Sequence, residues 1–303
     1  MAGERRLERQ VMREATERLA AADGAVTTSV VTAVAGAALH HLESGRGRPM
    51  VLLHGGSGGG ANWFRIIPRL STHARVLAPD LPGFGLSDPG RPRSPLGTTA
   101  ADTLAQWMAA LGLTDAVIAG TSFGGLAALR LAQQASERVA SVFLLDSAGL
   151  GRELHPLVRL ATVPGLTRLG VRPTRAGTAT VFRNLLTANR ASLTDEQSDA
   201  LVDYLYLSAR RAGTPYLAET LRLFCGPMGQ REVLSPAELA ALAQPVHVAW
   251  GALDRFLPVA HGQAAARHCH RSRFTLLDDA GHSPNWETPD AVSQALLALL
   301  AAD

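Results

Sequence analysis

The sequence has no lysine, and all 29 of its Lys/Arg residues are arginine. Without lysine the protein cannot form a Schiff base with pyridoxal phosphate or with a carbonyl substrate, and it lacks the lysine of a Walker A phosphate loop. The 29 arginines are balanced by 26 acidic residues, which leaves a net charge of only +3. No cluster of arginines is interleaved with aromatic residues, so we expect no binding to nucleic acid.

Cysteines and long apolar segments are also scarce. The two cysteines, Cys225 and Cys269, cannot form a framework of disulfides, which is typical of proteins from a reducing compartment. No run of about 18 apolar residues is present, and the first residues are charged where a secretory signal would be apolar. We therefore expect a soluble, cytoplasmic protein that has no membrane partner.

The pattern of the remaining sequence is typical of an α/β protein. The chain has 303 residues, 47% of them hydrophobic, which suffices for one large domain with an insertion. Residues 4–22 predict an amphipathic helix that packs on the surface, or that covers a site or a partner subunit. Short apolar runs then alternate with helical patterns, and the predicted strands are 26–34, 37–43, 50–54, 75–79, 115–119, 139–145, 245–250 and 273–277. Continuous apolar strands indicate a mostly parallel eight-stranded sheet with helices on both faces.

The alternation stops between residues 149 and 236, where helical stretches alternate with prolines and glycines and no clear strand is found. We interpret this segment as a helical cap inserted in the sheet domain. The predicted organisation is an N-terminal helix at 1–24, a core domain formed by 25–148 and 237–303, and a cap at 149–236.

A candidate nucleophile lies between an apolar strand and a helical pattern, in Gly120-Thr121-Ser122-Phe123-Gly124. A serine at such a turn is held in a strained backbone conformation, and the residues two positions away must be small. Gly120 and Gly124 meet this condition. The turn also directs the helix N-terminus at the reacting carbon, so the backbone N–H of Phe123 can stabilise an oxyanion.

A serine nucleophile needs a base, and the base needs an acid that orients it. His282 follows the last predicted strand, and Asp254 follows the strand before it. Both lie beyond the carboxyl ends of strands, where open α/β sheets hold their sites. We predict a triad of Ser122, Asp254 and His282, with Asp146, after the strand at 139–145, as the alternative acid.

Two further motifs follow the third and fourth strands: Leu53-His54-Gly55-Gly56 and Asp80-Leu81-Pro82-Gly83-Phe84-Gly85-Leu86-Ser87. With the Ser122 motif they make the chain similar to α/β-hydrolases from residue 26 onward. The resemblance implies the α/β-hydrolase fold, and it implies that the backbone N–H of Gly56 is a second oxyanion donor opposite Phe123. We interpret the Asp80 motif as a structural turn, with a chemical role for Asp80 as the alternative.

No metal or organic cofactor is expected, because the triad and two backbone donors already supply nucleophile, proton transfer and charge stabilisation. His268, Cys269 and His270 look like a metal cluster, but adjacent residues at a helix end point in different directions. His40 and His41 alternate across a strand, so at most one of them faces the site, and a surface role is favoured.

The pocket should be lined by the cap together with Asn62, Trp63 and Trp286, whose motifs place them beside the catalytic turns. The segment from Gly60 to Arg65 resembles that of hydrolases that break a carbon–carbon bond in vinylogous diketones of meta-cleavage pathways. The chain departs from those enzymes in two places. Ser283 follows the histidine where they have tryptophan, and the corresponding cap helix has Asp203 instead of an arginine, with Arg210 or Arg211 as substitutes.

The sequence predicts a hydrolase that cleaves a carboxylic ester of a small apolar or aromatic molecule through an acyl-enzyme on Ser122. Carbon–carbon bond hydrolysis of a vinylogous diketone is the first alternative. A non-catalytic ligand-binding protein on the same fold is the alternative from another class. The sequence pattern indicates no particular oligomeric state.

Overall fold

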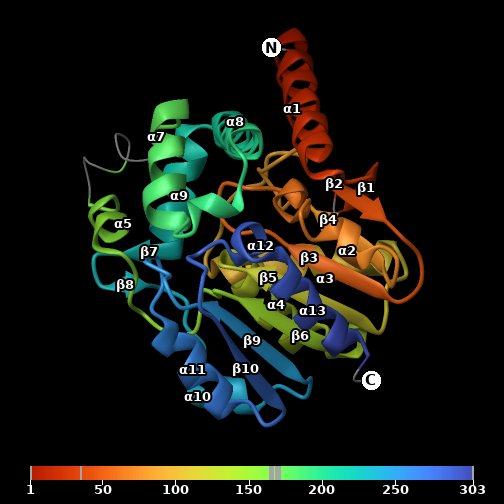
Figure 1. Ribbon diagram of the computed structural model, residues 1–303, viewed down its shortest axis with the longest axis vertical. Helices are drawn as coiled ribbons and strands as arrows, with labels where there is room; N and C mark the ends of the chain where they lie inside the picture. Colours follow the sequence, from red (N-terminus) through yellow and green to blue (C-terminus); the bar gives the residue numbers. More distant parts are fainter. Residues whose placement is uncertain (1, 35, 164–166, 168–171, 302–303) are drawn as a thin grey trace.

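The computed structural model describes residues 2–34, 36–163, 167 and 172–301. Eight strands form one sheet in the order β1-β2-β4-β3-β5-β6-β9-β10 (Figure 1). The bounds are β1 Thr28–Val34, β2 Ala37–Ser44, β3 Pro49–Leu53, β4 Arg75–Pro79, β5 Ala116–Thr121, β6 Val139–Leu145, β9 Val246–Gly251 and β10 Ser272–Leu277. The β1–β2 and β2–β4 pairs are antiparallel and the other neighbours are parallel. The predicted fold class, with its mostly parallel eight-stranded sheet, is confirmed.

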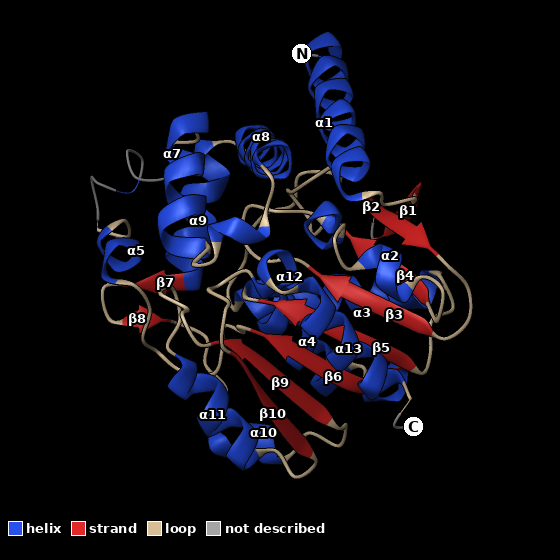
Figure 2. Ribbon diagram, viewed as in Figure 1, coloured by secondary structure: helices blue, strands red, loops and turns tan. Residues whose placement is uncertain are grey.

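Helices cover both faces of this sheet (Figure 2). Successive side chains of a strand point to opposite faces, and those of β3 enter two apolar clusters, with Val51 and Leu53 in one and Met50 and Leu52 in the other. The first cluster includes residues of α3 (Leu96–Ala110), α4 (Phe123–Gln134), α10 (Pro236–Ala240) and α11 (Val259–His268). The second includes residues of α2 (Ile67–Leu70), α12 (Pro284–Glu287) and α13 (Pro289–Leu300).

The segment between β6 and β9 is largely helical and lies over one end of the sheet (Figure 1). Its elements are α5 Pro156–Leu160, α7 Arg175–Val181, a π-helical turn Phe182–Leu186, a 3-10 turn Arg190–Ser192, α8 Asp195–Ala212, α9 Thr214–Phe224, β7 Cys225–Gly226 and β8 Gly229–Gln230. The antiparallel β7–β8 pair was not predicted, because two residues in each strand are too few for a period-two pattern. The division into core and cap stays a prediction.

Helix α1 (Ala2–Asp23) packs along α8. Among residues 6–23 of this helix, the buried side chains are Met12, Ala15 and Leu19, at the spacing of one helix face. Arg18 forms an ion pair with Asp203 of α8 at 2.7 Å. Within the described part of the chain, no helix is long and apolar enough to cross a membrane.

Candidate active site

Ser122 lies where β5 passes into α4, and its backbone is strained. Its φ of 52° and ψ of −120° lie outside the regions that side-chain-bearing residues prefer. The turn requires glycine on both sides. A Cβ on Gly120 would lie 2.2 Å from the carbonyl oxygen of Gly124, and a Cβ on Gly124 would lie 2.3 Å from that of Leu53. The local sequence therefore forces the serine to stand out at the end of the sheet.

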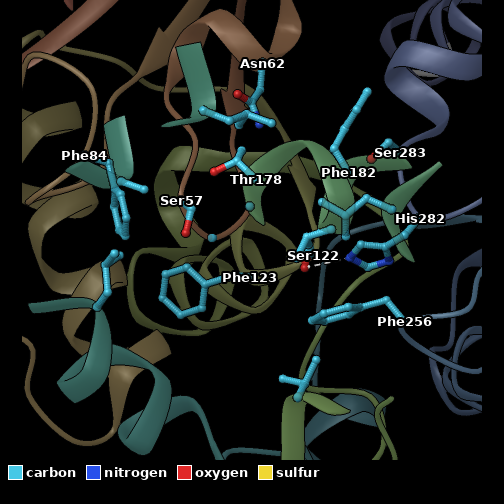
Figure 3. Close-up of a pocket in the computed structure, with 18 of the residues that line it drawn as sticks. Ser57, Asn62, Phe84, Ser122, Phe123, Thr178, Phe182, Phe256, His282 and Ser283 are labelled. Carbon is cyan, nitrogen blue, oxygen red and sulfur yellow. Dashed lines mark hydrogen bonds between the residues drawn. The ribbon is translucent and has the colours of Figure 1, made fainter. Parts of the chain in front are cut away.

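The structure brings Ser122, His282 and Asp254 together. Figure 3 shows Ser122 beside the imidazole of His282. Ser122 Oγ lies 3.1 Å from His282 Nε2, and His282 Nδ1 lies 2.8 Å from Asp254 Oδ2. The second oxygen of Asp254 accepts the backbone N–H groups of Phe256 at 2.7 Å and Leu257 at 3.0 Å. These bonds hold the carboxylate in one orientation, so that His282 donates from Nδ1 and accepts at Nε2.

Asp146, the alternative acid, is fully buried but does not contact His282 through a hydrogen bond in the described chain. Its Oδ1 accepts the backbone N–H of Gly251 at 2.9 Å. Burial, followed by the negative charge of Asp254, raises the pKa of Asp146 well above its ordinary value. The carboxylate that orients the imidazole is therefore that of Asp254.

The two predicted oxyanion donors, Gly56 and Phe123, both line the cavity in front of Ser122. The backbone N–H groups of Gly56 and Phe123 donate no hydrogen bond to any described residue. His54 fixes this loop: its Nδ1–H donates to the Gly55 carbonyl at 2.6 Å, and its Nε2 accepts the N–H of Leu81 at 2.9 Å. Burial lowers the pKa of His54, which keeps the ring in the neutral form that these two bonds require. The sequence motif Leu53-His54-Gly55-Gly56 contains His54 but does not by itself predict this role.

The cavity has a volume of about 430 Å³ and is lined by both the sheet domain and the inserted helical segment. Its walls are mostly apolar, with Phe84, Phe123, Phe182, Phe224 and Phe256 among the residues that line it. Arg172 is the one cation among the described residues that line it, and it is exposed at the side of the inserted segment. Within the described chain Arg172 forms no hydrogen bond or ion pair.

Two of the three predicted substrate-contacting residues, Asn62 and Trp286, line this cavity. Trp63 does not, and the prediction for it was wrong. Trp63 ends the 3-10 turn Gly60–Trp63, and its side chain is fully buried in the apolar cluster that also holds Met12 and Leu19. The turn rotates neighbouring side chains to different directions, so Asn62 faces the cavity and Trp63 faces the core.

Phe256 is a site residue that the sequence reasoning missed. Its ring is stacked on the imidazole of His282, with centroids 4.7 Å apart and planes inclined by 30° (Figure 3). Ser283 follows the histidine and lines the cavity, but it has no aromatic ring. The aromatic contact to His282 is made instead by Phe256, in the loop after β9. The sequence feature that could have indicated Phe256 is its position two residues after Asp254, in a turn whose backbone N–H groups donate to that carboxylate.

The charged residues of the inserted segment that we considered as contacts to an acidic substrate, Asp203, Arg210 and Arg211, do not line the cavity. Asp203 pairs with Arg18 and Arg175, and it does not line the cavity. Arg211 donates to the Gly85 carbonyl at 2.7 Å, and Arg210 is exposed outside the cavity. The expectation that Asp203 stands where a cation is wanted was therefore wrong, because helix α8 turns this residue towards α1 and α7.

Asp80 holds loops in place rather than facing the cavity. Its Oδ1 accepts the N–H of Gly60 at 2.6 Å, and its Oδ2 accepts that of Leu86 at 2.7 Å and Nδ1 of His40 at 2.7 Å. Burial alone would raise the pKa of Asp80, but the hydrogen bond and charge of His40 and the two backbone donors outweigh it, so the pKa lies below its ordinary value. These hydrogen bonds support the structural interpretation of this motif. The surface position expected for His40 and His41 was wrong, because both side chains are buried.

Glu287 of α12 joins the histidine loop to the inserted segment. Its Oε1 accepts the N–H groups of Ala188 at 2.6 Å and Asn189 at 2.7 Å, and its Oε2 accepts that of Gly281 at 2.9 Å and Ser283 at 3.3 Å. The residues on both sides of His282 are thus held by one buried carboxylate.

One group of three His, Cys, Asp or Glu side chains in the described chain brings possible ligand atoms within 4.8 Å of one another, and it consists of Asp146, Asp254 and His282. His268, Cys269 and His270 are not in such a group. Because His282 Nδ1 and Asp254 Oδ2 already share a hydrogen bond, we interpret the three side chains as a proton-sharing chain and not as a cation site.

Comparisons with known proteins agree with this geometry. Residues 48–289 match the family model described as alpha/beta hydrolase fold. A 2-hydroxy-6-oxo-6-phenylhexa-2,4-dienoate hydrolase of Burkholderia cepacia is 30% identical over 272 residues, which cover 87% of this chain and 91% of that protein. The structure of an esterase from Thermogutta terrifontis has a TM-score of 0.72 at 28% identity, covering 91% of this chain and 98% of that one. A serine hydrolase involved in carbazole degradation has a TM-score of 0.77 at 25% identity, covering 92% and 100%. The chain belongs to the alpha/beta-hydrolase fold family, whose members are hydrolases.

Proposed function

We propose that this protein is a serine hydrolase in which Ser122 is the nucleophile, His282 the general base and acid, and Asp254 the orienting carboxylate. The backbone N–H groups of Gly56 and Phe123 would receive the oxyanion. The chain of contacts from Ser122 Oγ through His282 to Asp254, at 3.1 and 2.8 Å, supports these roles. No metal or organic cofactor is needed for this chemistry.

The reaction then proceeds in two halves. Ser122 Oγ attacks the carbonyl carbon while its proton passes to His282 Nε2, and the carbonyl oxygen becomes an oxyanion. When the oxyanion collapses, the bond to the leaving group breaks and the leaving group takes the proton from His282. A water molecule then attacks the acyl carbon, His282 takes its proton, and the acid is released as Ser122 Oγ regains a proton.

We further propose that the bond broken is a carbon–carbon bond of a vinylogous diketone acid, the first alternative to the predicted ester. The substrate in the name of the Burkholderia cepacia relative has a ketone, a conjugated diene and a carboxylate but no ester, so hydrolysis at its ketone must break a carbon–carbon bond. The 2-hydroxydiene must first tautomerise to its 2-keto form, in which the enol proton moves to carbon 5 beside the ketone. The electron pair left on this carbon when the bond breaks is then delocalised onto the conjugated keto acid, and this fragment takes the proton from His282.

The observation that carries this choice is the cavity itself. An acid with an apolar tail needs one cation and otherwise apolar walls, and Arg172 supplies that cation among the described lining residues. A guanidinium binds a carboxylate through two parallel hydrogen bonds. The sequence had disfavoured an acidic substrate because of Asp203, and that objection falls because Asp203 lies outside the cavity.

Ester hydrolysis remains the second candidate. Ser283 stands beside the base where the resemblance to carbon–carbon hydrolases implies tryptophan, and the Thermogutta terrifontis neighbour is an esterase. An ester needs only the triad and the two donors, so a neutral ester makes no use of Arg172.

The test measures kcat/KM for a dienone acid and for phenyl butyrate on the same preparation, with the native protein and with Arg172→Gln. We expect the acid to be the better substrate and Arg172→Gln to raise its KM about tenfold or more without changing that of the ester, since a charge-assisted pair is lost only with the acid. An ester that exceeds the acid tenfold in both proteins would instead establish the second candidate. Failure of a fluorophosphonate to label Ser122 would favour the non-catalytic alternative.

We also propose that the enzyme works in the cytoplasm. Cys225 and Cys269 are both free and buried. Burial raises the pKa of Cys225 to about 12 and that of Cys269 to about 11, so both remain neutral thiols with little tendency to exchange. Two thiols of this kind are compatible with a reducing compartment.

A further inference from the structure

Asp146 is the buried acid that the proposed mechanism does not use. It follows β6 directly and has a positive φ of 46°, which only a few residues with side chains adopt. Its backbone N–H donates to the Ala249 carbonyl at 3.1 Å, and its Oδ1 accepts the N–H of Gly251 at 2.9 Å. The end of β6 is thereby tied to the end of β9, the strand that leads into the Asp254 loop.

The other oxygen of Asp146 has no partner. Oδ2 is buried and forms no hydrogen bond with any described residue, although a carboxylate left this way is costly. A carboxyl oxygen of Asp146 also lies within 4.8 Å of Asp254, whose own side chain is fully buried. Two buried carboxylates this close repel each other, which disfavours the ionisation of both.

The contacts of Asp254 decide which of the two keeps the proton. Asp254 accepts two backbone N–H groups and His282 Nδ1, all of which favour its ionised form. Asp146 accepts one N–H group. The charged or titratable groups that face Asp146 in the described chain are Asp254, His282 and Glu287, and two of these three are acids.

We propose that Asp146 is a positioning residue that stays protonated and donates a hydrogen bond to Asp254, holding that carboxylate against His282. The inference rests on the proposed triad and extends it to a chain of four side chains. Burial and the negative charge of Asp254 raise the pKa of Asp146, which is consistent with a retained proton. A carboxylate fixed from two sides loses less orientation when the imidazolium forms.

Two substitutions of similar size separate this role from mere packing. Asp146→Asn keeps an oxygen for the Gly251 N–H and offers an N–H to Asp254, so it imitates the protonated acid. Asp146→Leu offers neither. Asp146 does not line the cavity, so neither change touches the substrate.

The experiment measures kcat and KM for phenyl butyrate at pH 7.5 with the full chain. We expect Asp146→Leu to lose roughly 10- to 100-fold in kcat with little change in KM, because a hydrogen bond to a charged group is lost. Asp146→Asn should retain most of the wild-type kcat, whereas Asp254→Asn should lose several orders of magnitude. Equal damage from Asp146→Asn and Asp146→Leu would overturn the proposal, because it would show that Asp146 acts as an anion.

Infrared spectroscopy tests the proton directly and does not depend on turnover. The difference between wild-type and Asp146→Asn protein at pH 7.5 should contain the carbonyl stretch of a protonated carboxylic acid, and its absence would refute a protonated Asp146. The labelling of Ser122 by a fluorophosphonate is measured in parallel. If Ser122 is labelled and the Asp146 results fail, only this inference is wrong; if Ser122 is not labelled, the proposed function itself is wrong.

Discussion

The ring of Phe256 offers a sharp test of how the base is stabilised. In the proposed mechanism His282 becomes an imidazolium when it takes the proton of Ser122, and the face of Phe256 is stacked on this ring at 4.7 Å. A cation over a desolvated aromatic ring gains about 1–2 kcal/mol. Phe256→Leu keeps an apolar side chain but removes the ring face, so kcat should fall roughly 5- to 30-fold.

The measurement is kcat and kcat/KM between pH 5 and 9, and the matched control is Phe224→Leu. Phe224 also lines the cavity, but its ring contacts Phe123 at 6.4 Å and not His282. We expect the control to change KM more than kcat. A kcat of Phe256→Leu within twofold of wild type would refute the stacking argument.

Three further outcomes are expected. Ser122→Ala should fold normally and lose several orders of magnitude in kcat, because the triad acts as a unit; retention of more than about a tenth of the activity would exclude Ser122 as nucleophile. EDTA should leave activity unchanged, and a complete loss that a divalent ion restores would contradict a metal-free mechanism. Acid should weaken the fold through His41, whose pKa burial lowers from 6.5 to about 4: the unfolded state binds the proton first, so stability is complete above pH 6.5 and is lost as the pH falls towards 4. Between pH 8 and pH 5, the free energy of unfolding measured in urea should fall by about 2 kcal/mol less in His41→Phe than in wild type. Equal pH dependence in the two proteins would contradict this assignment.

The features that sequence reasoning predicted well are those whose causes are local. Gly120 and Gly124 flank Ser122 because a Cβ on either would collide with backbone only a few residues or one strand away. The strands were predicted to within a few residues because those at the centre of the sheet are buried on both faces and are therefore continuously apolar. The loop of Gly55 and Gly56 was identified through the resemblance to α/β-hydrolases, and the role of Gly56 as an oxyanion donor stays a prediction.

The choices that failed or stayed open depend on how distant segments meet. Trp63 and Asn62 are neighbours in a motif, and only the packing of the 3-10 turn between α1 and the sheet decides which faces the cavity. Asp203 has the spacing of a cap residue near the substrate, but helix α8 places it against α1 and α7. The aromatic contact to His282 comes from Phe256, in the loop after β9, and not from residue 283 beside the histidine. No single motif predicts a contact that joins two loops.

By itself, then, the sequence determined the α/β-hydrolase fold and the strained serine turn at Ser122, since backbone sterics and the alternation of buried residues depend on short stretches of chain. The roles of Ser122 and His282 as nucleophile and base stay predictions. Only the tertiary structure decided how the two candidate acids share the site. Leu145 of β6 pairs with Ala249 of β9, and this register carries Asp146 to the backbone of Gly251 and next to Asp254. The register is set by the packing of the whole sheet, and the electrostatic coupling of two buried carboxylates depends on a few ångströms of separation that no local pattern encodes.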